Sequence, residues 1–148
     1  MSVELSAQCA RIFHRLDMAQ QRSTVECIEE ERGAEHHPEL WLRFAESLGV
    51  KRDEVADAVP LPETLDLVNT FRTLTRDRSY QAGLVALLAY ESQIPEVAAT
   101  KIDGLRRFYG ISHERGLSFF QVHLRADRFH ANTARQILHE HLTPAEAE

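Results

Sequence analysis

The sequence predicts an all-helical fold, and two observations lead to that prediction. Glycine and proline are scarce, at 6 and 5 of 148 residues, so few positions interrupt a helix. Apolar residues also recur at three- and four-residue steps along most of the chain, which is the spacing of one helix face. With no internal repeat and no linker, we expect a single helical bundle over residues 1–142 and a flexible tail over 143–148.

Capping residues place the helix boundaries in the first half of the chain. Asp17 is a favourable N-cap residue, and Pro38 fits the first turn of a helix. Gly33 and Gly49 are the expected stops, because glycine adopts the left-handed conformation that ends many helices. The helices expected in this half cover residues 2–16, 17–32, 38–48, 51–58 and 63–77.

The second half of the chain is expected to form two long helices. Residues 79–108 are the longest periodic stretch, and Pro95 should kink it because proline removes one backbone hydrogen bond. The last helix is expected over about 112–142, with a break near Gly116.

Charge and hydropathy exclude several classes of function. A net charge of -6 and a pI of about 5.7 argue against a nucleic-acid-binding surface, which is normally basic. No apolar run approaches the roughly 18 residues of a membrane span. Cys9 and Cys27 suggest no disulfide framework, so we expect a soluble protein of the reducing cytoplasm.

The most specific chemical pattern is His123, Asp127 and His130 on the last helix. Positions i, i+4 and i+7 fall within about 60° of one another, so the three side chains share one helix face. Two imidazoles and a carboxylate are a donor set suited to ferrous iron with positions left open for oxygen. The alternative is a solvated helix face that carries histidines by chance.

A second pattern lies at the corner between two expected helices, where three glutamates precede a pair of histidines. Glu30 lies in the last turn of one helix and His37 caps the start of the next, so both can reach one ion. Glutamates at a helix C-terminus oppose the helix dipole, which favours a compensating cation. Periodicity does not decide which glutamate points inward, and such clusters are often simply solvated.

Glu91 is the third candidate, because it lies inside the apolar stripe of Leu84, Leu87 and Leu88 on the longest helix. A carboxylate on a core face is costly unless it is paired or bound to a metal. The three regions together can supply two metal ions, although they lack the Glu-x-x-His pairs of ferritin-like bundles. The six candidate ligands are Glu30, His37, Glu91, His123, Asp127 and His130.

These residues lie in the stretches EEERGAEHHPELWLRFAESLG, LLAYESQIPEVAATKIDGL and FFQVHLRADRFH. The stretches resemble the heme-oxygenase-like diiron oxidases and oxygenases, in the branch of the chlamydial death-domain-associating protein. That branch is related to the pyrroloquinoline-quinone synthesis protein C and to the thiaminase-like proteins. Its metal motif is Glu-x6-His, a distant Glu, then His-x3-Asp-x2-His, and the six candidates match it in register. The match selects Glu30 over Glu29 and His37 over His36.

The resemblance implies a heme-oxygenase-like bundle with two iron ions, or manganese in one of the two sites. It implies an oxidase or oxygenase that uses O2 on a small organic substrate, with p-aminobenzoate synthesis as one branch. Lys101 matches a lysine thought to supply an amine there, although an ordinary exposed lysine is the alternative. Tyr90 matches an aromatic position beside the site, which packing also explains. The apolar lining expected to exclude water is Leu87, Leu88, Phe119, Phe120 and Phe129.

The chain also differs from the family that it resembles, because members of that family usually begin with further N-terminal helices. The bundle is therefore expected to be shortened at its N-terminus, and a homodimer or larger assembly would cover the exposed apolar surface. The alternative function is a non-catalytic, shortened helical module that binds metal or a partner protein.

Overall fold

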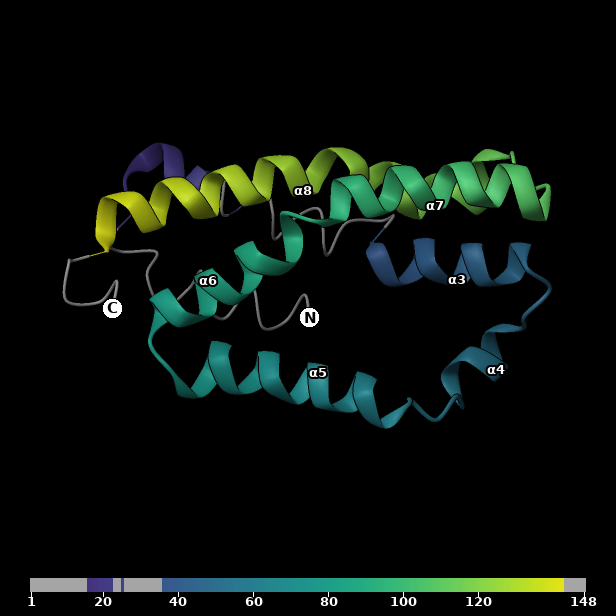
Figure 1. Ribbon diagram of the computed structural model, residues 1–148, viewed down its shortest axis with the longest axis horizontal. Helices are drawn as coiled ribbons and strands as arrows, with labels where there is room; N and C mark the ends of the chain where they lie inside the picture. Colours follow the sequence, from purple (N-terminus) through teal and green to yellow (C-terminus); the bar gives the residue numbers. More distant parts are fainter. Residues whose placement is uncertain (1–15, 23–24, 26–35, 143–148) are drawn as a thin grey trace.

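The computed structural model describes residues 16–22, 25 and 36–142, and in these ranges it contains helices and no strand (Figure 1). The all-helical prediction is therefore confirmed. Six α-helices and one π-helical turn, η2, follow residue 36. They are α3 (His37–Ser47), α4 (Arg52–Ala56), α5 (Pro62–Arg72), η2 (Thr73–Asp77), α6 (Tyr80–Glu91), α7 (Ile94–Tyr109) and α8 (Glu114–His141). None of these helices is long and apolar enough to cross a membrane.

The 28-residue helix α8 organises the fold, because α3, α6 and α7 all pack against it (Figure 1). At 1.5 Å per residue it is about 42 Å long. Its first half meets α7 and α3, and its second half meets α6. The first contact buries a cluster of Ala98, Ile102, Leu105, Ile111, Leu117 and Phe120. The second buries Leu16, Leu84, Ile137 and Leu138.

Two expectations about helix boundaries need correction. Pro95 does not kink one long helix: α6 ends at Glu91, and Pro95 lies in the first turn of a separate helix, α7. Proline is tolerated there because the first N–H groups of a helix have no partner within it. Gly116 does not interrupt α8 either, since it lies in the first turn, where its N–H donates to His113 Nδ1 at 3.2 Å.

Two of the expected capping residues lie where they were predicted. Asp17 is a cap as expected, because its Oδ1 accepts from the N–H of Gln20 at 2.9 Å. Gly49 takes a φ of 82° just after α3, as a helix-ending glycine should. The expected helix over 2–16 and the stop at Gly33 lie outside the described residues, apart from the buried Leu16.

None of the residues of helix α5 is buried, and the same holds for the short helix α4. The π-helical turn η2 continues α5 directly at Thr73 and leads to α6 (Figure 1). Leu65 and Leu67 remain 46% and 48% exposed. The apolar stripe that predicts this helix is therefore only partly covered within the described part of the chain.

Candidate functional site: a histidine–carboxylate cavity

A cavity of about 690 Å³ lies against α8, walled by α3, α6 and α7. Its lining combines many apolar and aromatic side chains with a few polar ones. The polar lining includes Glu91 from α6, Lys101 from α7, and His123 and Asp127 from α8. With Tyr90 of α6, five predicted site residues from three helices therefore line the same cavity.

Helix α8 directs its predicted ligands into the protein. Asp127 and His130 are 4% and 5% exposed, and His130 Nδ1 lies 3.6 Å from Asp127 Oδ1. Asp127 Oδ2 accepts no hydrogen bond from any described residue, although it is fully buried. A buried carboxylate oxygen in this state is costly unless a cation satisfies it. The chemistry of this group therefore fits a bound metal ion.

His123 is held from two sides. Its ring packs on Phe119 and on His37, with ring centroids 4.3 Å apart in both cases. Its Nδ1 lies 2.7 Å from the carbonyl oxygen of Phe119, one turn earlier on α8. Because a carbonyl only accepts, Nδ1 carries the proton and the lone pair of the neutral ring is on Nε2. Fixing the tautomer through the second nitrogen is how proteins orient histidine ligands of metals.

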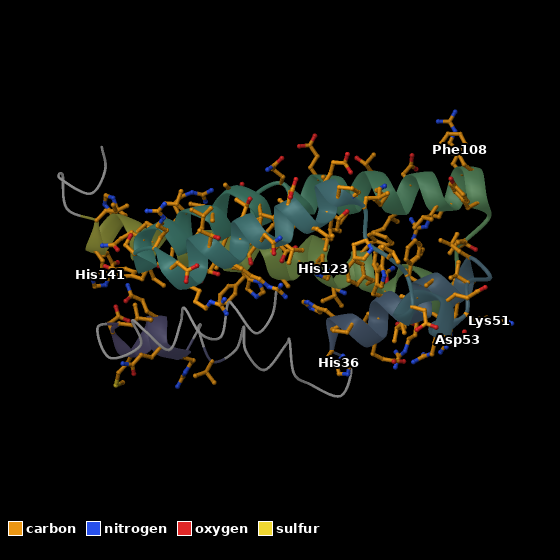
Figure 2. All side chains as sticks on the ribbon, turned by 90° about the horizontal axis from the view of Figure 1, so that it is seen from below. His36, Lys51, Asp53, Phe108, His123 and His141 are labelled. Atoms are coloured by element: carbon orange, nitrogen blue, oxygen red, sulfur yellow. The ribbon has the colours of Figure 1, made fainter. Side chains whose placement is uncertain are left out.

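The two neighbouring histidines before α3 have different positions. His36 is the N-cap of α3, and its Nδ1 accepts from the N–H of Glu39 at 3.2 Å. His37 is the first residue of the helix and is buried against His123. The expectation that His37 caps this helix is therefore wrong, since its neighbour does so. In Figure 2, His36 lies at the edge of the molecule and His123 lies among the packed helices.

Tyr90 lies close enough to a carboxylate of α6 and to one of α8 for both to affect its pKa. It is half-buried, and its ring meets the edge of Phe71 at a centroid distance of 5.5 Å. Desolvation raises the pKa of its phenol, and the negative charges of Asp127 and Glu91 raise it further. Both carboxylates are thus close enough to Tyr90 to act on it. The aromatic residue beside Glu91 therefore lies at the cavity wall between two predicted ligands.

The candidates do not form a closed metal shell as they stand. Within the described ranges, no three His, Cys, Asp or Glu side chains lie close enough together to hold a metal ion. Glu30, the sixth candidate, lies outside those ranges. The donors come from separate helices, and like-charged carboxylates repel one another unless a cation lies between them. The structure thus places five candidates around one region without showing a coordination geometry.

The apolar lining was predicted in part. Leu87, Phe119 and Phe120 line the cavity, whereas Phe129 is 43% exposed on another face of α8. Leu88 is also elsewhere, because it packs on the cluster around Leu84. One residue turns a helix by about 100°, so neighbours such as Leu87 and Leu88 face different surroundings.

Several lining residues escaped the sequence reasoning. Trp41 and Leu48 of the α3 region are 43% and 42% exposed because they face the cavity instead of the core. Val97 and Gly104 flank Lys101 along α7. Their steps of three and four residues from Lys101 are the signal that places all three on one helix face.

Comparison with known proteins identifies the family. A family model described as an iron-containing redox enzyme matches residues 5–148, which is nearly the whole chain. The chain belongs to this family. The predicted resemblance is thereby confirmed, and iron is the metal against which the donors of the cavity are to be judged.

Members of the family with assigned functions include proteins named 4-aminobenzoate synthase. The protein of Nitrosomonas europaea is 46% identical over 111 residues, which is 75% of this chain and 45% of that protein. Those of Chlamydia pneumoniae and Chlamydia trachomatis are 41% and 35% identical over the same length, or 49% and 48% of each protein. The chain thus spans about half the length of the curated relatives it matches.

Proposed function

We propose that this chain is an iron-dependent oxidase or oxygenase that uses O2 to transform a small organic substrate. The observation that carries the proposal is the buried Asp127 carboxylate, whose Oδ2 has no hydrogen-bond partner among the described residues. It opens on a largely apolar cavity together with Glu91 and His123. Because the chain belongs to a family of iron-containing redox enzymes, we propose that the cation bound by this carboxylate is iron.

The ligands in this proposal are the six residues that match the family motif. Held by these carboxylates and imidazoles, two ferrous ions would supply the reduction of O2 coupled to oxidation of the substrate. Manganese in one of the two sites is compatible with the same donors. The proposed ligands are Glu30, His37, Glu91, His123, Asp127 and His130.

Other residues of the cavity orient the proposed ligands and keep water away from the reacting groups. The hydrogen bond from His123 to the Phe119 carbonyl holds the imidazole in one tautomer, and the ring of His37 restricts its rotation. Leu87, Phe119 and Phe120 reduce the access of water to the reacting groups. Exclusion of water matters because oxidising intermediates otherwise react with solvent.

Lys101 and Tyr90 are the proposed residues beyond the ligands. Among the described lining residues, Lys101 is the one lysine or arginine, so its amine can bind an anionic group or act as a nucleophile when deprotonated. Tyr90 can hold or deliver a proton at its phenol oxygen beside the two carboxylates.

The named relatives point to an aromatic product. They are called 4-aminobenzoate synthases, and we propose that this chain acts in the same synthesis. The aromatic walls of the cavity, which include Trp41, Phe44 and Phe119, are suited to a flat ring.

The test is anaerobic loading with ferrous iron followed by exposure to O2. We expect O2 consumption together with an absorbance change as the iron is oxidised. Oxidation by the Asp127→Asn variant, treated in the same way, should fall to the rate of free iron in buffer. Iron that binds tightly but consumes no O2 would contradict the oxidase and support the non-catalytic, metal-binding module instead.

A further inference from the structure

The cavity has two chemically different ends. Glu91, His123 and Asp127 lie at one end, and Phe120 and Leu105 lie at the other, within the α7–α8 core contact. Asp127 lies seven positions after Phe120 on α8, which corresponds to about 10 Å along the helix. A ligand that reaches the polar end therefore has room for an apolar part in the other direction.

Gly104 lies in the cavity wall near the apolar end, between Lys101 and Leu105 on α7. An added Cβ would meet no heavy atom within 4 Å, so close packing does not require glycine at this position. Its backbone does not require glycine either, because Gly49 and Gly110 are the described residues with positive φ. A glycine inside a helix lowers stability relative to alanine, yet here the structure shows no packing or backbone reason for it.

The consequence of glycine at this position is space in the cavity. Without a side chain, the backbone of α7 itself forms part of the wall of the cavity that aromatic side chains of α3 also line. Those side chains include Trp41 and Phe44, which line the same cavity. Lys101 lies one turn before Gly104 and places a positive charge beside this space.

We propose that Gly104 determines the size of the apolar group that the cavity admits, and that the ligand is an aromatic or alkyl carboxylate whose anionic group lies near Lys101. This rests on the proposed function only in taking the cavity as the substrate site. A side chain at position 104 would occupy the space that a large ligand needs and leave smaller ligands room to bind. Specificity here is a ratio of two affinities, so the test compares two ligands of different size.

The experiment measures binding of benzoate and of naphthalene carboxylate to the iron-free protein by calorimetry. For Gly104→Leu we expect the naphthalene carboxylate affinity to fall about tenfold or more, and the benzoate affinity to change less than about twofold. The matched control is Ala99→Leu, which adds the same side chain to an exposed position of α7 outside the cavity. It should change neither affinity.

A second measurement separates a role in specificity from a role in folding. Gly104→Ala should raise the melting temperature by about 2–4 °C, because alanine favours the helix and its Cβ has open space. A lower melting temperature would mean that the fold needs glycine and would overturn the proposal. So would equal losses of both ligands in Gly104→Leu, no loss of either, or no binding to the wild type.

Iron binding distinguishes failure of this proposal from failure of the proposed function. Gly104 carries no side chain that could bind a metal and is not a candidate ligand, so Gly104→Leu should bind as much ferrous iron as the wild type. Unchanged iron binding with unchanged ligand selectivity would contradict only the role of Gly104.

Discussion

At the scale of single residues, Asp127 carries the strongest argument for a metal site. Its carboxylate is buried and one of its oxygens has no hydrogen-bond donor among the described residues. A fold that keeps such a group loses stability, because the charge has left water without full compensation. We infer that binding of a cation compensates for this loss.

Asp127→Asn should therefore have two opposite effects. Iron affinity should fall at least about tenfold, because an amide is a poorer ligand than a carboxylate. Stability of the iron-free protein should stay the same or rise by about 1 kcal/mol, because an unsatisfied buried charge is removed. Metal titration and thermal unfolding measure the two effects. Loss of stability without loss of iron affinity would show that Asp127 is only structural.

His36→Ala is the matched control for the histidine corner. The variant loses the side chain that accepts the hydrogen bond of the Glu39 N–H, so stability should fall by about 1 kcal/mol. Iron affinity should not change, because the buried neighbour His37 is the proposed ligand. If His36→Ala reduced iron binding as much as Asp127→Asn, the assignment at this corner would be wrong.

A network of arginines and glutamates that joins α3 to the start of α4 gives a pH prediction. Arg52 donates to Glu39 at 2.7 and 3.0 Å and also to Glu46, and Arg43 bonds Glu39 from one turn away. These hydrogen bonds, that of Arg52 first, lower the pKa of Glu39 from 4.5 to about 2. A carboxyl group whose pKa is lower in the folded protein than in the unfolded chain stabilises the fold at any pH above the unfolded pKa. This stabilisation is lost as the pH falls toward the pKa of the folded protein.

Glu39→Gln should accordingly lower the melting temperature at pH 7, and the difference from wild type should shrink between about pH 4.5 and 2. The effect should be small, because the partners are solvent-exposed and water screens them. Thermal unfolding across this pH range measures it. A difference that stays constant from pH 7 to 2 would refute the sign of the effect.

At the scale of elements, two glycines in helices have opposite roles. Gly104 has open space around it, whereas a Cβ on Gly116 would lie 2.6 Å from Ile111 Cγ2 and 3.0 Å from Ser47 Oγ. Gly116 thus allows the start of α8 to approach the end of α3. Gly116→Ala should destabilise the protein by about 1–3 kcal/mol, and denaturant unfolding would show it. A gain in stability like that expected for Gly104→Ala would contradict this account.

Periodicity and capping residues predicted most of the helices. The predictions were wrong where the local sequence was compatible with two different structures. Pro95 is compatible with a kink and with a first turn, and only the packing of α6 and α7 decides between them. His36 and His37 are both suited to a cap, and the burial of His37 distinguishes them. The cavity was not predicted as a shape, because it depends on how α3 and α7 are placed on α8.

At the scale of the whole molecule, a homodimer stays a prediction. Val59, Leu61 and Leu65 are 89%, 68% and 46% exposed at and before α5, a helix that buries no residue. Phe108 projects from the end of α7 and is 72% exposed (Figure 2). Exposed apolar side chains close together in the chain, such as those at and before α5, commonly mark an interface.

Size-exclusion chromatography with light scattering tests this prediction. We expect a species of about twice 16.9 kDa, and Leu61→Ser with Leu65→Ser should shift it toward monomer. A well-folded monomer near 16.9 kDa would show that α5 needs no partner copy.

The central claim is that histidines and carboxylates from separate helices hold iron around one cavity. The most direct measurement is metal analysis of the chain after anaerobic loading with ferrous iron and removal of the excess. The account predicts about two iron ions per chain, since six candidate donors divide into two sets of three. A wild-type protein that folds normally but retains no iron would contradict it.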